Sequence, residues 1–401
     1  MDSKLTASPC LPLRETRRDS RREAPSFVDS RPVGTSFFYA TFLLLVRIVL
    51  VAIRTWIDYV AVPLSMYFNA IHLASDGRRS SEGVDITRNV VYGDLRGESM
   101  DVLRPSGTND PRNSILYVHG GGFVSVHRAV LNHSMTPLVR AGFTVFSIDY
   151  PLAPEFKHPT AIVSVLKALS YLKTERGVES VHLIGDSAGG CLVSMAVAAL
   201  SNQDKSWDVR INDFMKQNSF PEVHGVSLLY SICDEDSWSD RDDHSYMNRM
   251  IAGILRTCIA LYKSSPEERV TIADNFDKVE KFPPTFLLCG NTDLLTYSHE
   301  VFEQHLSSIG SEVKSVVTQG FHGYHGLPVP FSFGVWRTTV FPATCELIRW
   351  LTGGDEKRVP SLPPRSMAEY DFHLLIFLCL LHLIPFFVIW YTMQTPASSS
   401  L

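Results

Sequence analysis

Short apolar stretches alternate with longer amphipathic ones through the middle of the chain. Eight stretches of four to six residues are rich in β-branched and aromatic side chains and are bounded by Gly, Pro or charged residues, a pattern typical of buried strands. They are Val90–Gly93, Met100–Leu103, Ser114–Val118, Phe143–Ile148, Val181–Ile184, Val226–Tyr230, Thr285–Cys289 and Val313–Val317. The helical patterns are Pro159–Glu175, Ala188–Leu200, Tyr246–Tyr262, Leu294–Ile309 and Val335–Leu351.

The order of these stretches predicts an α/β fold. The first two strand candidates have no helix between them, which favours an antiparallel pair at the start of the sheet. The later strands alternate with helices, and that alternation is typical of a parallel sheet covered by helices on both faces. We therefore expect an α/β domain over residues 86–352 with a mostly parallel, eight-stranded sheet. The polar stretch from Cys233 to Lys281 is long enough to hold a lid over a site.

The N-terminal end has a different pattern. Residues 1–34 are polar and carry a run of arginines between Arg14 and Arg22, which predicts a disordered basic tail or the cytosolic flank of a membrane segment. Residues 35–75 are mostly apolar, and Arg47 and Arg54 within them fall on one face of a helix. We expect this segment to associate with a membrane, either in the interface or as a hairpin. A single crossing is the alternative.

The C-terminal end predicts a membrane anchor. After a charged linker at residues 353–371, the stretch Phe372–Met393 has 22 residues without a formal charge, which matches the length of a bilayer span. Trp390 and Tyr391 fit an interfacial belt at its end, whereas a buried helix of the globular domain is the alternative. Lysines and arginines precede this transmembrane helix and none follows it, which favours a cytosolic domain on a membrane such as the endoplasmic reticulum.

Composition narrows the classes of function. With 401 residues, 45% of them hydrophobic, the chain can bury the core of one large domain. The formal net charge of −5 gives no support for nucleic-acid binding. Seven cysteines are scattered without a C-x-x-C pair, which argues against a disulfide framework and a zinc site. Neither H-E-x-x-H nor G-x-x-x-x-G-K-[ST] occurs, so we expect no metal and no organic cofactor.

One pentapeptide carries a candidate nucleophile. Gly185-Asp186-Ser187-Ala188-Gly189 fits a nucleophile elbow, in which a sharp strand-to-helix turn exposes a serine. The sequence lies where such a turn requires, between a strand candidate and a helix candidate. Glycines are needed on both sides of the serine because Cβ atoms would clash in so tight a turn. Ser187 is therefore the candidate nucleophile, and a helix N-cap is the alternative role for a serine here.

A run of glycines follows an earlier strand candidate, in the sequence His119-Gly120-Gly121-Gly122. Three consecutive glycines cost conformational entropy, and a flexible loop would be the simplest explanation. A chemical explanation is that backbone N–H groups must approach a developing oxyanion without side chains in the way. On that interpretation Gly121 and Gly122 donate to the oxyanion, and the N–H of Ala188 is a third donor.

The partners of a nucleophilic serine follow the elbow in the order acid, then histidine. Asp293 stands just past the strand candidate Thr285–Cys289, and an N-cap of the next helix is the alternative role for it. His322 and His325 both lie in the loop after the last strand, from which a side chain can fold back over the sheet to Ser187. Position alone leaves both histidines open.

Taken together, these motifs resemble the hormone-sensitive-lipase-like family of α/β hydrolases, which includes carboxylesterases and arylacetamide deacetylase. The matching segments are His119-Gly-Gly-Gly-Phe123, Asp149-Tyr-Pro-Leu-Ala-Pro-Glu155, Gly185-Asp-Ser-Ala-Gly-Gly190, Gly290-x-x-Asp293-x-Leu295 and His322-Gly-Tyr. The resemblance spans roughly residues 89–350. It favours His322 over His325, because His322-Gly-Tyr fits the family's H-G-F sequence. It also implies the α/β-hydrolase fold for this domain.

The implied activity is hydrolysis of a carboxylic ester by two-step acyl transfer, with Ser187 as nucleophile, His322 as base and Asp293 orienting the base. We expect lipophilic esters with a small acyl group as substrates, and membrane lipid as a partner. Amide deacetylation is not separated from ester hydrolysis by the sequence. A non-catalytic ligand-binding receptor or scaffold on the same fold is the alternative from another class of function.

Similarity to arylacetamide deacetylase also keeps a second topology open. In that arrangement, residues 37–53 cross the membrane once and the domain is luminal. The sequence Asn132-His133-Ser134 is a glycosylation acceptor that only a luminal domain would offer to the modifying enzyme.

Overall fold

An eight-stranded sheet forms the centre of the computed structural model, which describes residues 83–107, 113–239, 245–323 and 339–361, together with residues 52 and 55. The strands are β1 (Val84–Val91), β2 (Ser99–Pro105), β3 (Ser114–Val118), β4 (Thr144–Ile148), β5 (Ser180–Asp186), β6 (Glu222–Leu229), β7 (Thr285–Gly290) and β8 (Val313–Thr318). Their order in the sheet is β1-β2-β4-β3-β5-β6-β7-β8.

Strand β2 pairs antiparallel with β1 and β4, and every other pair in the sheet is parallel. The carboxyl ends of β3, β5, β6, β7 and β8 therefore meet at one edge of the sheet, where the loops that follow them lie together. The expected mostly parallel sheet with an antiparallel start is confirmed.

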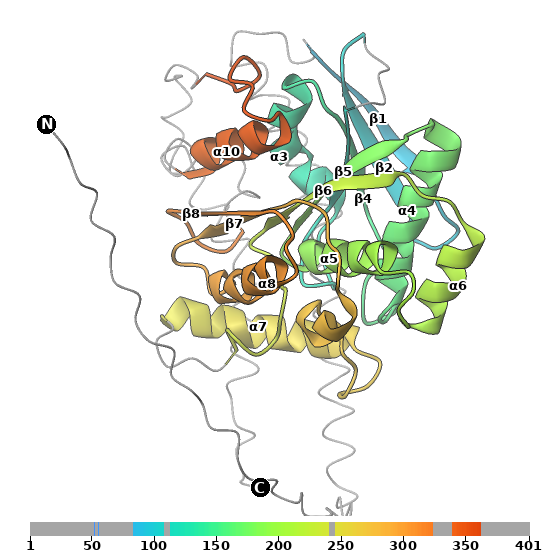
Figure 1. Ribbon diagram of the computed structural model, residues 1–401, viewed down its shortest axis with the longest axis vertical. Coiled ribbons are helices and arrows are strands. Elements are labelled where there is room, and N and C mark those ends of the chain that lie inside the picture. The colour runs from blue at the N-terminus through green and yellow to red at the C-terminus, as the bar shows by residue number, and fades with distance from the viewer. Residues whose placement is uncertain are drawn as a thin grey trace, which may run out of the picture. The chain divides into compact units, whose positions relative to one another are not determined.

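Helices cover both faces of this sheet (Figure 1). They are α3 (Arg128–Arg140), α4 (Thr160–Arg176), α5 (Ala188–Ser201), α6 (Val209–Gln217), α7 (Tyr246–Tyr262), α8 (Thr296–Ser308) and α10 (Phe341–Leu351), with the 3-10 helix η3 at Ala273–Lys278. The apolar residues of α3 and α10 pack into one core cluster, and those of α4, α5, α7 and α8 pack into another. Each core cluster lies between its helices and one of the two faces of the sheet.

Helix α5 follows β5 directly and is the most deeply buried helix of the described chain. Its sequence is almost wholly small or apolar, and twelve of its fourteen residues are buried. Alanine, glycine and serine at its contact positions let the backbone come close to the sheet and to α4, with which it packs in one core. A helix without a polar face can only be stable where it is covered on all sides.

The first strand begins earlier than the sequence pattern predicted, at Val84 rather than Val90. Its central four residues are exposed because β1 is an edge strand, so burial leaves no apolar signature there. Helices α3 and α6 were not predicted. Helix α3 contains Pro137, which removes a backbone donor and weakens the helical pattern.

The two segments predicted to associate with a membrane, residues 35–75 and Phe372–Met393, lie outside the described residues apart from residues 52 and 55, as does the greater part of the linker. Among the residues that the structure does describe, no helix combines the length and the hydropathy that a bilayer crossing needs.

Candidate active site

Ser187 stands at the turn between β5 and α5 with φ 49° and ψ −120°, a backbone conformation that side-chain-bearing residues rarely adopt. The turn is tight because Gly189 lies against the end of β3: a Cβ on Gly189 would come 2.1 Å from the carbonyl oxygen of Val118. The amide of Ser187 donates to the carbonyl oxygen of Leu229 on β6 at 2.9 Å. Ser187 occupies the N-cap position of α5, but its hydroxyl makes no capping hydrogen bond to the helix.

Three side chains that the sequence analysis selected lie in line at the carboxyl edge of the sheet. The Oγ atom of Ser187 is 3.1 Å from Nε2 of His322. On the other side of the imidazole ring, Nδ1 of His322 lies 3.1 Å from Oδ2 of Asp293 and 3.3 Å from its Oδ1. His322 comes from the loop after β8, and Asp293 from the loop after β7, so two β-α connections bring these groups together.

Asp293 is held in place by its own loop. Its Oδ1 atom accepts a hydrogen bond from the amide of Leu295 at 2.9 Å, directly before α8 begins. The N-cap residue of α8 is Leu295 and not Asp293, so the alternative N-cap role is wrong; the Asp293 carboxylate instead bonds the amide of Leu295 and faces His322 as well. Both contacts are compatible because a carboxylate has two oxygens and several acceptor positions.

The pKa of His322 is set by opposing effects. Burial disfavours the charged imidazolium and would lower the pKa, but the charge of Asp293, its hydrogen bond to Nδ1 and the charge of Asp186 outweigh burial. The pKa of His322 is consequently raised above its ordinary value of 6.5. The ring of Tyr230 contacts the imidazole edge to face, with ring centroids 5.3 Å apart.

The glycine loop, which we define as residues 119–123, begins at the end of β3 beside Ser187. Gly121 has φ 105°, and a Cβ there would lie 2.3 Å from the carbonyl oxygen of Ser125, so only glycine fits. The Gly121 carbonyl oxygen accepts from the amides of Val124 and Ser125 and from the Ser125 hydroxyl. Within the described chain, the amides of Gly121, Gly122 and Ala188 donate to no other residue.

Asp186, the residue before Ser187, anchors the glycine loop. Its Oδ1 atom accepts from the hydroxyl of Tyr117 at 2.7 Å and from the amide of Gly120 at 2.9 Å. The side chain is buried, and burial raises the pKa of this carboxyl despite those two donors. A Cβ on Gly120 would approach Asp186 Oδ2 to 2.6 Å, so the two residues fix each other's place.

A buried ionic cluster supports the other side of the glycine loop, and sequence reasoning missed it. Nε2 of His119 lies 3.2 Å from Oδ1 of Asp149, and the guanidinium of Arg128 bridges Asp149 to Asp101. His127 adds a second imidazole, with Nε2 3.1 Å from Asp149 Oδ2. Burial would raise the pKa of Asp149, but His119, His127 and Arg128 lower it below its ordinary value.

One signal in the sequence pointed at this cluster. Asp149 is the first residue of the motif Asp149-Tyr-Pro-Leu-Ala-Pro-Glu155, directly after a buried strand, and a carboxylate in that place needs a partner. Nothing marked Arg128 as that partner, because Arg128 opens the helix that was not predicted.

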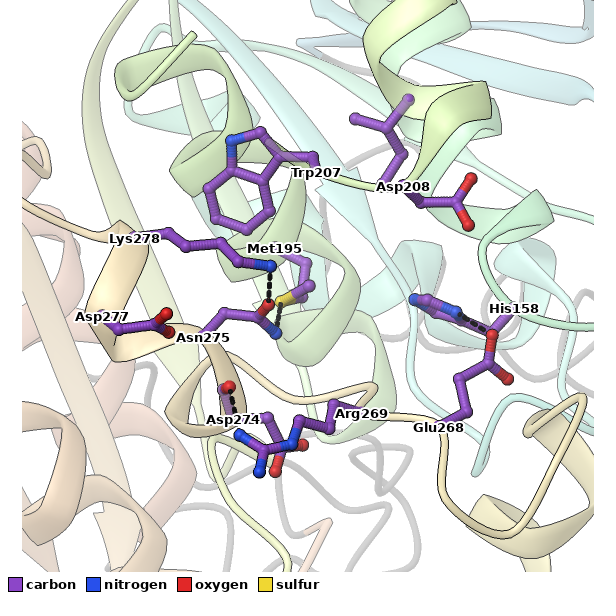
Figure 2. A pocket seen from close by; sticks show the side chains of 11 residues that line it. His158, Met195, Trp207, Asp208, Glu268, Arg269, Asp274, Asn275, Asp277 and Lys278 are labelled. Atoms are coloured by element: carbon purple, nitrogen blue, oxygen red, sulfur yellow. Dashed lines mark hydrogen bonds and ion pairs between the residues drawn. The ribbon is translucent and has the colours of Figure 1, made fainter. Parts of the chain in front are cut away.

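A separate cavity of about 320 Å³ lies away from these residues, beside α6 and η3 (Figure 2). Its lining includes His158, Met195, Trp207 and Lys278, and none of the residues selected from the motifs belongs to it. In Figure 2 the imidazole of His158 points toward Glu268, to which it is bonded at 2.8 Å. No cluster of three or more His, Cys, Asp or Glu side chains suited to a metal occurs among the described residues.

The remaining selected residues are placed as follows. His119 and Gly120 follow β3 in the glycine loop, Gly185 lies near the end of β5, and Gly189 lies in the first turn of α5. The competing histidine, His325, lies outside the described residues. Five cysteines are described, all buried and free.

Comparisons with known proteins agree with the fold. A family model described as an alpha/beta hydrolase fold matches residues 115–326, more than half of the chain. Among curated relatives, Lipase 2 of Moraxella sp. (strain TA144) is 23% identical over 286 residues, covering 63% of this chain and 65% of the lipase. Hormone-sensitive lipase of Mus musculus is 29% identical over 195 residues, covering 45% of this chain and 22% of the relative.

Coverage of the relatives is partial. The chain spans 65% of the Moraxella lipase and 51% of the kynurenine formamidase of Danio rerio, to which it is 24% identical over 163 residues. Among solved structures, an esterase from the bacterial hormone-sensitive lipase family superposes with a TM-score of 0.53 at 20% identity, covering 70% of this chain and 86% of that one. Esterase B from Lactobacillus rhamnosis gives a TM-score of 0.55 at 14% identity, covering 74% and 95%. At these identities the solved structures establish the fold. The resemblance to hormone-sensitive-lipase-like proteins is confirmed.

Proposed function

Since the chain belongs to the α/β hydrolase fold family, we propose that it is a serine ester hydrolase in which Ser187, His322 and Asp293 form the catalytic triad. The observation that carries the proposal is the line of contacts from Ser187 Oγ to His322 Nε2 at 3.1 Å and from His322 Nδ1 to Asp293 Oδ2 at 3.1 Å. Lipases and esterases among the relatives support the same class of reaction.

In the first step, His322 Nε2 takes the proton of Ser187 while the Ser187 oxygen attacks the carbonyl carbon of the ester. The carbonyl oxygen becomes an oxyanion, for which the unpartnered amides of Gly121, Gly122 and Ala188 are the proposed donors. The tetrahedral intermediate then expels the alcohol, whose oxygen receives the proton from His322, and an acyl-enzyme remains.

In the second step, His322 takes a proton from water, and the resulting nucleophile attacks the acyl-enzyme carbonyl. Collapse of the second tetrahedral intermediate releases the carboxylic acid and returns the proton to Ser187. Asp293 keeps the proton of the neutral ring on Nδ1 and stabilises the imidazolium that forms in each step. Apart from the attacking water, each proton transfer and the first nucleophile in these steps come from the triad residues.

Lipophilic esters with a small acyl group are the proposed substrates. The kynurenine formamidases among the relatives keep an amide-type substrate open as the second candidate. A non-catalytic receptor on the same fold is disfavoured because His322 contacts Ser187 through one ring nitrogen and Asp293 through the other, as a catalytic triad requires.

We also propose that the protein is anchored in a membrane through Phe372–Met393. The support for this is the sequence pattern of 22 residues without a formal charge. A membrane lipid environment would bring lipophilic esters to the domain.

Labelling with a fluorophosphonate tests the proposed nucleophile, because such a probe forms a bond only with an activated serine. We expect the wild-type protein to be labelled and Ser187→Ala to be silent. Ser194→Ala, on the helix that follows Ser187, is the matched control, because Ser194 is fully buried and its hydroxyl donates to the carbonyl oxygen of Cys191. Labelling that survives in Ser187→Ala would overturn the assignment.

A further inference from the structure

Helix α7 contacts the glycine loop at two neighbouring positions. A Cβ built on Gly122 would lie 2.9 Å from the Sγ atom of Cys258 and 3.1 Å from its Cβ, so the two residues are in direct contact. One turn further along α7, the ring of Tyr262 stacks on the ring of Phe123, with centroids 4.3 Å apart and planes 3° apart. Cys258 and Tyr262 are four residues apart and therefore share one face of the helix.

Phe123 needs such support. Its φ of 66° lies in the left-handed region, where a Cβ atom crowds the backbone and only glycine is at ease. The carbonyl oxygen of Phe123 accepts a hydrogen bond from the amide of Ala153 at 2.9 Å, which fixes one side of this residue. The stacked ring of Tyr262 fixes the other side. Phe123 directly follows Gly122, so a fixed Phe123 restrains the Cα atom of Gly122, to which the amide proposed as an oxyanion donor is attached.

Tyr262 is itself held firmly. Its backbone carbonyl accepts from the amide of His158 at 2.9 Å, and the His158 ring meets the Tyr262 ring edge to face at 5.6 Å. His158 is in turn bonded to Glu268. The Tyr262 side chain is buried, and its hydroxyl has no hydrogen-bond partner in the described part of the chain. The contact that matters is therefore the ring, not the hydroxyl.

We propose that Tyr262 and Cys258 are positioning residues that hold the amides of Gly121 and Gly122 in the orientation required to bind the oxyanion. This inference rests on the proposed ester hydrolysis. The long connection between β6 and β7 contains α7, and on this proposal it orients the oxyanion donors, which no triad residue does. An oxyanion contact is stronger in the transition state than in the ground state, so its loss lowers kcat and leaves KM nearly unchanged.

The first test compares Tyr262→Leu with Tyr262→Phe on a p-nitrophenyl ester. Tyr262→Phe keeps the ring and removes only an unbonded hydroxyl, so we expect kcat within about two-fold of the wild type. Tyr262→Leu removes the stack, and we expect kcat to fall by roughly ten-fold or more with KM almost constant, toward the ~10²-fold loss that follows removal of one oxyanion donor.

A matched control separates positioning from general packing. The ring of Phe276 in η3 stacks on that of His305 in α8, with centroids 3.9 Å apart and planes 3° apart, and neither residue belongs to the glycine loop or to α7. Phe276→Leu makes the same ring-to-aliphatic change and is expected to lower the melting temperature without lowering kcat. If Tyr262→Leu also lowers only the melting temperature, Tyr262 merely packs and the inference is overturned.

Cys258 provides an independent arm if Tyr262→Leu does not fold. Cys258→Leu adds atoms where Sγ already touches Gly122, so we expect a fall in kcat at constant KM, whereas the size-matched Cys258→Ser is expected to keep most of kcat. Unchanged kcat in a folded Cys258→Leu contradicts the inference. Failure of the proposed function would appear elsewhere, as a wild-type protein without ester hydrolysis or without labelling at Ser187.

Discussion

At the scale of single residues, the chemistry depends on where the charges around His322 lie. Burial alone would make this histidine a weak base, and the adjacent carboxylates of Asp293 and Asp186 restore and exceed its ordinary basicity. Asp186 has two functions, because the carboxyl group that helps to raise the pKa of His322 also accepts a hydrogen bond from the amide of Gly120 in the glycine loop. The base and the proposed oxyanion site therefore share one buried carboxyl group.

The raised pKa of His322 predicts the acid limb of the pH profile. Only the neutral imidazole can take the Ser187 proton, so kcat/KM is expected to fall as pH drops, with its midpoint above the ordinary histidine value of 6.5. Asp293→Asn removes the largest effect that raises this pKa, so the midpoint should move to lower pH. The same change is expected to lower kcat by about 10⁴-fold, since it permits the wrong tautomer. A midpoint that stays in place in Asp293→Asn would show that Asp293 does not govern the base.

At the scale of elements, a buried neutral histidine, His182, lies where β5 pairs with β6. Nε2 of His182 on β5 lies 2.8 Å from the hydroxyl of Ser227 on β6. The ring has room because Gly225 lies beside it: a Cβ on Gly225 would come 2.7 Å from Nδ1 of His182. Burial, with a smaller contribution from His224, lowers the pKa of His182 from 6.5 to about 3.

This histidine predicts a loss of stability in mild acid. Between pH 6.5 and about 3 the unfolded chain binds a proton at residue 182 that the folded chain does not, so the contribution to stability is complete above 6.5 and is lost as pH falls. The loss is at most about 1.4 kcal/mol per pH unit for one group. Urea unfolding at pH 7.5, 6 and 5 should therefore show a shallower decline for His182→Gln than for the wild type. Identical slopes would refute this account.

At the scale of the whole molecule, the proposed membrane anchor leaves two possible sides for the domain, the cytosolic and the luminal. The glycosylation acceptor Asn132 cannot separate them. Its side chain is 6% exposed, and its Nδ2 atom donates to Asp101 at 2.8 Å within the buried ionic cluster. Absence of a glycan at Asn132 would therefore not argue against a luminal domain, because the amide is buried and bonded in the folded state.

The proposed anchor predicts that the full chain stays in the membrane pellet after a carbonate wash. In sealed microsomes, protease is expected to digest the domain that contains Ser187 without detergent, because the positive charges before Phe372–Met393 favour the cytosolic side. Full protection would move the domain to the lumen, and release by carbonate would remove the anchor itself.

The parts of this protein that follow from the sequence alone are those with a local physical cause. The turn around Ser187 needs glycine at positions 185 and 189, because Cβ atoms there would clash with the neighbouring backbone. All the residues that express this requirement lie within one pentapeptide. The parallel sheet follows from alternating apolar stretches, except at β1, where an exposed edge strand leaves no apolar signature.

Contacts between distant residues were decided only by the tertiary structure. Sequence position left His322 and His325 equal, and a resemblance preferred His322; the contact of Ser187 Oγ with His322 Nε2 depends on how the loop after β8 returns over the sheet. The bridge from Arg128 to Asp101 and Asp149, and the packing of α7 on Gly122, join residues that no periodicity relates. Charge pairs and packed rings require only that two groups meet in space, so they leave no pattern along the chain.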